Sequence, residues 1–243
     1  MGKTIAIVGA GEGVGLAVAE RFGREGFNVA LLARSTERSQ ALVSKLQSRG
    51  IEASGFEADI LNRDALTKSL ERAAERFGSI DVMEFSPLPT GAMPAPRQMT
   101  VEDQQYHLEL NVLGPIAAVR AVLPQMLRRK SGSLLFTTAA SAQRPLIMTA
   151  PFGVAAGALL NYVRILNRDV STDGIYAGII SIAGIIVNIG QAEAGNAAHF
   201  PLAVPRIKAE EVADLHWRLH SERTECEVII GDAERIFAIP GFR

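Results

Sequence analysis

Three glycines near the start of the chain have the spacing of a loop that binds phosphate groups. Gly9, Gly13 and Gly15 follow a short apolar run and precede a helical pattern. Residues without side chains let backbone amides approach a pyrophosphate at the positive end of a helix. We therefore expect a dinucleotide to bind at Gly9, Gly11, Gly13, Val14 and Gly15. The alternative is a tight turn with close helix packing and no ligand.

The second apolar run ends in Arg34-Ser35, nineteen residues beyond Gly15. A dinucleotide fold holds the adenosine ribose near this point, where an acidic residue would select NAD. A guanidinium and a hydroxyl instead suit a 2′-phosphate, so NADP is favoured over NAD. Glu12 adds a negative charge to the glycine loop, and a solvated surface role for Arg34 therefore stays open.

Asp59 and Ile60 follow the segment Glu52–Glu57, the third predicted strand. At this position they could seat the adenine, with the Asp59 carboxylate accepting a hydrogen bond from the exocyclic amine. Asp59 could also cap the helix that follows, and the two roles are compatible.

Alternating apolar runs and helical patterns predict one α/β domain, a doubly wound Rossmann-type fold with a seven-stranded parallel sheet flanked by helices. The predicted strands are Thr4–Val8, Asn28–Ala33, Glu52–Glu57, Ile80–Phe85, Ser133–Thr138, Tyr176–Ile182 and Glu227–Ile230. The predicted helices are Val14–Arg24, Thr36–Arg49, Arg63–Phe77, Val101–Arg129, Phe152–Val170 and Ala209–Ser221.

Two long segments follow predicted strands and are candidates for the mouth of a substrate or effector site. One is the proline-rich stretch 87–96, and the other is the stretch 185–208, which has weak periodicity. Both come after carboxyl ends of strands, where open α/β sheets bind ligands. We expect residues 1–243 to form the single NAD(P)-binding domain, with 185–208 as its substrate or effector loop.

The chain resembles the short-chain dehydrogenase/reductase family over nearly its whole length. The resemblance is carried by the G-x-x-x-G-x-G spacing, the position of Asp59, Asn111-Val112-Leu113-Gly114, the strand from Gly132 to Thr138 and the Ala183-Gly184 turn. It implies a strand order of 3-2-1-4-5-6-7, a nicotinamide cofactor that also meets Gly184, a small-molecule substrate, and a homodimer or homotetramer.

The resemblance fails where the family carries its catalytic Ser, Tyr and Lys. Those positions hold Ala139, Phe152 and Ala156. In the family, the Tyr transfers the proton, the Lys four residues later lowers its pKa, and the Ser orients the carbonyl. Of the family's four catalytic positions, only Asn111 is retained, and Phe85-Ser86-Pro87-Leu88 replaces an Asn-Ala-Gly signature.

Three residues could take over part of the missing chemistry. Thr138 and Ser141 carry hydroxyls near Ala139, and Asn111 precedes Gly114-Pro115, where a proline kink could hold a water molecule. The leading hypothesis is an NADP(H)-dependent oxidoreductase that acts on an apolar substrate by a non-standard proton route. The alternative is a non-catalytic module that senses NADP(H) or binds a partner.

Four other titratable residues stand in noticeable places. Glu84 lies in an apolar run, where pairing with an arginine or contact with water at the strand end is favoured over a raised pKa and a role as proton donor. His216 and His220 are one helical turn apart, as metal ligands can be, but a solvated helix face is favoured. His199 could reach the pocket from the loop after the sixth strand.

Composition excludes several classes of protein. The 243 residues carry a formal net charge of −1 with no basic run, so nucleic acid is not an expected partner. The apolar stretch 177–189 is shorter than the ~20 residues that a membrane span needs, and no membrane association is expected. A single cysteine excludes an internal disulfide and fits a cytoplasmic protein, and no metal site is expected.

Overall fold

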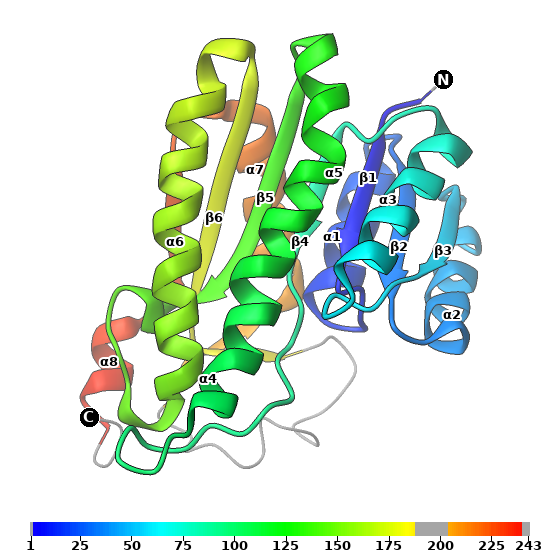
Figure 1. Ribbon diagram of the computed structural model, residues 1–243. Coiled ribbons are helices and arrows are strands. Elements are labelled where there is room, and N and C mark those ends of the chain that lie inside the picture. The colour runs from blue at the N-terminus through cyan, green and yellow to red at the C-terminus, as the bar shows by residue number, and fades with distance from the viewer. Residues whose placement is uncertain (1, 188–203, 240–243) are drawn as a thin grey trace.

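The computed structural model describes residues 2–187 and 204–239. Seven parallel strands form its main sheet, in the order β3-β2-β1-β4-β5-β6-β9 (Figure 1). Their bounds are β1 Thr4–Val8, β2 Asn28–Ala33, β3 Ala53–Glu57, β4 Val82–Phe85, β5 Gly132–Ala139, β6 Ile175–Ala183 and β9 Glu227–Gly231. The predicted fold class and strand order are confirmed, and each predicted strand agrees to within two residues.

Helices cover both faces of this sheet (Figure 1). One face packs against α1 (Val14–Arg24), α2 (Thr36–Gln47) and α7 (Ala209–Glu222). The other packs against α3 (Arg63–Phe77), α5 (Gly114–Arg129) and α6 (Ala150–Val170). The central strands are therefore buried on both sides, which explains their unbroken apolar sequences.

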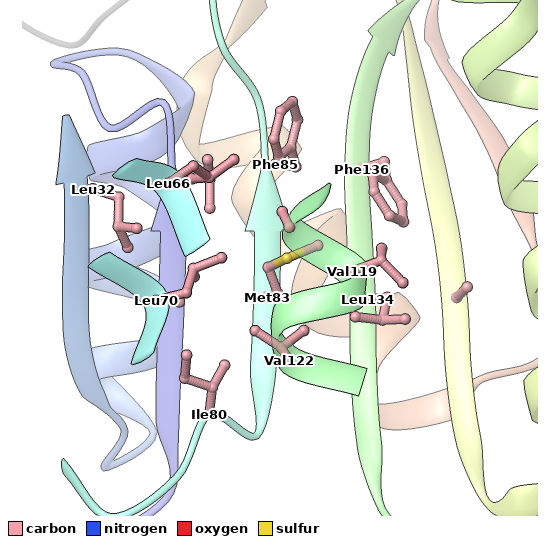
Figure 2. Packing of buried hydrophobic residues seen from close by; sticks show 14 of the residues in the cluster. Leu32, Leu66, Leu70, Ile80, Met83, Phe85, Val119, Val122, Leu134 and Phe136 are labelled. Atoms are coloured by element: carbon pink, nitrogen blue, oxygen red, sulfur yellow. The ribbon is translucent and has the colours of Figure 1, made fainter. Parts of the chain in front are cut away.

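The core on the second face is built from alternate residues of neighbouring strands. Figure 2 shows Met83 and Phe85 of β4 beside Leu134 and Phe136 of β5, under side chains of α3 and α5. These residues are essentially inaccessible to solvent. The packing fixes the carboxyl ends of β4 and β5, from which candidate site residues project.

The predicted single helix 101–129 is interrupted. It consists of α4 (Val101–Leu108), a π-helical turn (Glu109–Leu113) and α5. Gly114 and Pro115 are the first two residues of α5 and follow the π-helical turn directly, and the N–H of Gly114 donates to the carbonyl of Glu109, five residues earlier. Pro115 itself has no N–H to donate within this continuous helical stretch. The irregularity falls on the five residues before Gly114, which include Asn111.

A second, two-stranded sheet lies within the stretch 185–208. β7 (Ile185–Val187) and β8 (Arg206–Lys208) pair in parallel, with Ile185 opposite Arg206. The two ends of this stretch are therefore held together directly after β6 and directly before α7. Its central part, including His199, lies outside the described residues, and so does the end of the chain that follows α8 (Ala233–Phe237) and Ile239.

Two helical stretches, Val101–Arg129 and Ile147–Asp173, are long and apolar enough to cross a membrane by length and composition alone. In the fold, α5 and α6 contribute Val119, Val122, Leu159 and Val163 to the core against the main sheet. Their apolar character is thus explained by packing within the domain.

Candidate functional site

The glycine loop is attached to the ends of two strands. The backbone N–H groups of Gly9 and Ala10 both donate to the carbonyl oxygen of Leu32, at 3.1 and 3.0 Å. Gly9 has a φ of +87°, and a Cβ at this position would lie 2.7 Å from Cα of Pro87. Only glycine therefore fits at position 9, and the loop packs closely against the backbone of the segment that follows β4.

The start of α1 offers an open surface to an anion. A Cβ added at Gly11 would have no atom of the described residues within 4 Å. Gly13 is the N-cap residue of α1 and supplies no side-chain cap. The N–H of Leu16 donates to the carbonyl of Gly11 at 2.9 Å, so the N–H groups of Val14 and Gly15 are the ones left for a ligand. Open space in front of uncapped N–H groups fits the diphosphate of a dinucleotide.

Gly11 and the start of α1 form the candidate phosphate cradle. Charged side chains of both signs lie next to this cradle. Arg34 is exposed and makes no ion pair within the described residues, whereas Ser35 is the N-cap residue of α2 and also donates to Glu37. Glu12 pairs with Lys45 at 2.8 Å. This hydrogen bond and the charge of Lys45 lower the pKa of Glu12, which stays ionised but compensated. The negative charge of Glu12, which would repel a 2′-phosphate, is thus neutralised by Lys45.

The other predicted cofactor contacts have structural partners. Asp59 is exposed, and its Oδ1 accepts from the N–H of Leu61 at 3.1 Å. The expected capping of the next helix by Asp59 is wrong, because the side chain of Asn62 caps α3. Ile60 is buried, and a Cβ on Gly114 would lie 2.5 Å from its side chain. Gly184 lies against Pro205, whose carbonyl oxygen would be 2.5 Å from an added Cβ.

The predicted catalytic positions gather at the carboxyl end of β5 and the start of α6. Thr138 and Ala139 end β5, and Phe152 and Ala156 lie one turn apart near the start of α6, which packs against the turn after β5. Phe152 is partly exposed, whereas Ala156 is fully buried. Neither Phe nor Ala carries an ionisable group, so hydroxyl and imidazole groups nearby are the polar candidates.

Asn111 is linked to a histidine that sequence reasoning missed. The Nδ2 group of Asn111 donates to the backbone carbonyl of His107 at 3.1 Å, across the π-helical turn. His107 is fully buried, and its ring packs edge to face on Phe152 with centroids 6.2 Å apart. The spacing of four from Asn111 could have indicated a shared helix face.

Three buried polar atoms in this region have no hydrogen-bond partner among the described residues. They are Nδ1 of His107, Oγ of Ser141 and Oε1 of Gln104. The Nε2 group of Gln104 donates to the carbonyl of Pro151, directly before Phe152. Buried polar groups are normally paired, so unpaired ones beside a candidate site point to a ligand or to water.

The structure corrects the expectation for Glu84. Its side chain is fully buried on the α7 face, and it pairs with no arginine among the described residues. It accepts hydrogen bonds from Ser86 at 2.9 Å and Thr137 at 3.1 Å, and Nε2 of His216 lies 3.7 Å away. The prediction failed because α7, which supplies His216, is distant in sequence.

Burial favours the neutral forms of both titratable groups in this cluster. It raises the pKa of Glu84 to about 7, against the lowering effect of its hydrogen bonds to Ser86 and Thr137. It lowers the pKa of His216 to about 3. Between about pH 3 and pH 7, Glu84 and His216 are therefore both neutral and form a hydrogen-bonded chain through Thr137 rather than an ion pair.

The expected solvated face with His216 and His220 is also wrong. His216 is fully buried, and His220 accepts or donates a hydrogen bond of 2.8 Å with Ser133 while packing among Phe22, Phe27 and Trp217. Within the described residues, no three His, Cys, Asp or Glu side chains are grouped as a metal site requires.

Known proteins resemble this chain in sequence and in fold. Residues 3–196 match the family model described as short chain dehydrogenase. The chain is 28% identical to glucose 1-dehydrogenase 2 of Bacillus subtilis over 182 residues, which cover 74% of this chain and 70% of the relative. It is 24% identical to 3-oxoacyl-acyl-carrier-protein reductase FabG of Staphylococcus epidermidis over 191 residues, 77% of each chain.

A solved structure extends the likeness to the whole fold. L-Sorbose reductase from Gluconobacter frateurii, complexed with NADPH and L-sorbose, superposes with a TM-score of 0.82 at 22% identity and covers 96% of this chain and 98% of its own. With the family model spanning most of the sequence, the chain belongs to the short chain dehydrogenase family.

Proposed function

We propose that this protein binds NADP(H) and acts as an oxidoreductase on an apolar carbonyl or related substrate, by a proton route other than a Tyr–Lys pair. The observation that carries the proposal is the cradle formed by Gly11 and the uncapped start of α1. The residues proposed to hold the nucleotide are Gly9, Gly11, Gly13, Val14, Gly15, Arg34, Ser35, Asp59, Ile60 and Gly184.

The preference for NADP over NAD rests on local charge. Arg34 is exposed at the end of β2, next to the loop that hydrogen-bonds to Leu32, and Lys45 compensates Glu12. A guanidinium there can bind a 2′-phosphate through two parallel hydrogen bonds. Several structural neighbours, among them the sorbose reductase, were solved with NADP or NADPH bound, which supports the same choice.

The proton route is proposed from the groups that surround Phe152. When bound, the nicotinamide would supply or accept a hydride. Phe152 would form an apolar wall for the substrate, and Ala139, Phe152 and Ala156 would stand where relatives carry Ser, Tyr and Lys. Candidates for handling the substrate oxygen are Asn111, Thr138 and Ser141, and the Ser141 hydroxyl has no hydrogen-bond partner among the described residues.

A second candidate function is a non-catalytic NADP(H) sensor or a partner subunit. It is favoured by the burial of Ala156. At a fully buried position, neither solvent nor a neighbouring lysine can supply the positive charge that the family's lysine would provide. General acid catalysis contributes ~10²–10⁴-fold, so its loss would leave little ordinary carbonyl reduction.

Further parts of the proposal concern assembly and location. Val154 and Ile165 are exposed apolar residues on α6, which supports a homodimer or homotetramer that covers this helix. The stretch 185–208, anchored by β7 and β8, would form the substrate or effector loop of the single domain. A cytoplasmic location, with a small-molecule substrate or effector and with neither a membrane nor nucleic acid as partner, completes the proposal.

Titration separates the two candidate functions in two steps. NADPH and NADH are titrated against the protein by fluorescence, and NADPH should bind at least about tenfold more tightly, a difference of ~1.4 kcal/mol. Absence of binding by either at millimolar concentration would exclude both functions. If NADPH binds, turnover is then tested with aldehydes, ketones, quinones and enoyl thioesters.

The variant Phe152→Tyr/Ala156→Lys serves as the comparison for turnover. Turnover by the unmodified protein supports the oxidoreductase, whereas activity that arises only in the double variant supports the sensor. Because Ala156 is fully buried, a lysine there can disturb folding. Thermal unfolding of both single variants, with Phe152→Tyr as the milder change, shows whether a loss of signal reflects folding.

A further inference from the structure

A buried carboxyl group lies beside the candidate phosphate cradle. Glu84 of β4 is the register partner of Ile7 in β1, one strand spacing of ~4.8 Å away. Gly15 of α1 packs on the same isoleucine, because a Cβ added to it would lie 3.4 Å from Cγ2 of Ile7. The Glu84 carboxyl is therefore on the order of 10 Å from the N–H of Gly15, which is free to bind a ligand.

The residues that follow Glu84 contact the glycine loop directly. The N–H of Ser86 donates to the carbonyl of Val8 at 3.1 Å, and the backbone of Pro87 lies 2.7 Å from the position of a Cβ on Gly9. The hydroxyl of Ser86 donates to Oε2 of Glu84 at 2.9 Å. A single residue thus connects the buried carboxyl to the loop that would hold the nucleotide.

The surroundings of Glu84 do not offset a negative charge. Its register partners Ile7 and Leu135 are apolar, and its hydrogen-bond donors are the hydroxyls of Ser86 and Thr137. Among the described residues, His216 of α7 is the one titratable side chain that meets the carboxyl, with Nε2 at 3.7 Å.

His216 does not supply the missing positive charge. Its burial lowers its pKa to about 3, so the imidazole is neutral at physiological pH. Burial without a cationic partner raises the pKa of Glu84 to about 7. The carboxyl can therefore gain or lose its proton near neutral pH, and its partly exposed partners Ser86 and Thr137 lie between it and solvent.

A dinucleotide would bring further negative charge to the cradle. Two like charges ~10 Å apart in a site with an effective dielectric constant of about 20 repel each other enough to change an affinity about tenfold. Protonation of Glu84 removes this repulsion. The charge of the carboxyl and the binding of the nucleotide must then influence each other equally in both directions.

We propose that NADP(H) and a proton on Glu84 bind cooperatively: the protein with protonated Glu84 has the higher affinity for the nucleotide, and the bound nucleotide holds the proton on Glu84. This inference rests on the proposed function, since it concerns the same cradle. Below pH 7 the free protein already holds the proton, and the affinity is highest. As the pH rises from 6 to 9, Glu84 ionises and the affinity falls about tenfold.

NADPH titration of the full chain across this pH range tests the proposal, with Glu84→Gln as the variant that is neutral at every pH. The 2′-phosphate itself titrates near pH ~6. The quantity compared is therefore the ratio of the dissociation constant of the unmodified protein to that of Glu84→Gln at each pH. This ratio should rise about tenfold between pH 6 and pH 9.

Glu12→Gln is the matched control for a general effect of charge. Glu12 lies in the glycine loop, and its hydrogen bond to Lys45 and the charge of Lys45 lower its pKa, so it stays ionised throughout the range. The corresponding ratio for Glu12→Gln should be constant from pH 6 to pH 9. A pH dependence equal to that of Glu84→Gln would overturn the assignment to Glu84.

Infrared spectroscopy observes the proton itself. At pH 8, addition of NADPH should increase the C=O stretching band of a protonated carboxylic acid in the unmodified protein and not in Glu84→Gln. Ser86→Ala provides a second variant if Glu84→Gln does not fold. It removes a hydrogen bond that stabilises the carboxylate, which raises the pKa of Glu84 further and should move the fall in affinity to higher pH.

The outcomes separate this inference from the proposed function. NADPH binding with a constant Glu84→Gln ratio, or without a gain of the carboxylic acid band, would overturn the inference and leave the proposed function intact. An unchanged pH dependence in folded Ser86→Ala would also overturn it. Absence of NADPH binding at every pH would reject the proposed function and the inference together.

Discussion

Thr137 and His216, which are 79 positions apart in the chain, share a hydrogen bond of 2.8 Å in the interior of the domain. The same hydroxyl lies 3.1 Å from Oε1 of Glu84. One hydroxyl has one proton, so the direction of the chain depends on Glu84. When Glu84 is ionised, Thr137 donates to it and accepts from Nε2 of His216; when Glu84 is protonated, the chain can reverse.

Stability should therefore depend on pH through Glu84. Its pKa is raised from 4.5 to about 7 in the folded protein, because burial disfavours the carboxylate. The folded state binds the proton more tightly, so this contribution is complete below pH ~4.5 and is lost as pH rises to about 7, on the order of 3 kcal/mol in all. His216 acts in the opposite sense, because its lowered pKa of about 3 makes stability rise with pH up to about 6.5.

Glu84→Gln isolates the carboxyl contribution. This variant keeps a neutral side chain at every pH, so its free energy of unfolding relative to the unmodified protein should rise between pH 5 and 8. Urea unfolding across this range measures the difference. Parallel curves for the two proteins would show that Glu84 does not titrate near neutrality.

Thr137→Val should destabilise the protein by ~1–3 kcal/mol. The substitution conserves shape, but it leaves Nε2 of the buried His216 unpaired and takes one of two hydrogen-bond donors from Glu84. Thr138→Val is the matched control, because the Thr138 hydroxyl makes no hydrogen bond within the described part of the chain. Equal losses in the two variants would contradict a role for the Thr137 hydroxyl.

The sheet was predictable from sequence because strands buried on both faces leave unbroken apolar runs bounded by turn residues. The contacts between side chains that are distant in the sequence were not predictable in this way. Glu84 and His216 come from β4 and α7, and no local pattern relates them. His107 lies one turn before Asn111, which indicates a shared face, but its contact with Phe152 depends on how α4 meets α6.

Local interruptions were only partly predictable for similar reasons. Gly114-Pro115 indicates a break in the helix. It does not show that the irregular turn lies before the proline, at Glu109–Leu113. The anchoring of the stretch 185–208 depends on pairing between β7 and β8, two strands of three residues each. Strands that short carry too few residues for a pattern to be recognised.

Gly9→Ala should lower the stability of the protein, whereas Gly11→Ala should weaken NADPH binding. Gly9 has a φ of +87° and a Cβ there would lie 2.7 Å from Cα of Pro87, so Gly9→Ala should cost about 2 kcal/mol of stability or more. The methyl group of Gly11→Ala has no atom of the described part of the chain within 4 Å, so the stability of this variant should change by less than ~0.5 kcal/mol. The methyl group would nevertheless occupy the approach of the diphosphate and weaken NADPH binding.

Thermal unfolding and NADPH titration of both glycine variants check this pair. An unchanged NADPH affinity in a fully folded Gly11→Ala protein would place the nucleotide elsewhere. A Gly9→Ala protein as stable as the unmodified chain would contradict the close approach of the loop to Pro87.

Arg34→Ala should weaken NADPH binding and leave NADH binding nearly unchanged. A charge-assisted hydrogen bond contributes ~1.5–3 kcal/mol, so the loss should be roughly 10- to 100-fold for NADPH. Arg24→Ala is the charge-matched control, because Arg24 is exposed at the opposite end of α1, ~15 Å along the helix from the glycine loop. Titration of both nucleotides against the two variants measures the ratio of affinities. If Arg34→Ala lowered both affinities equally, Arg34 would bind the diphosphate or act through general charge, and the 2′-phosphate would have to be bound by another residue.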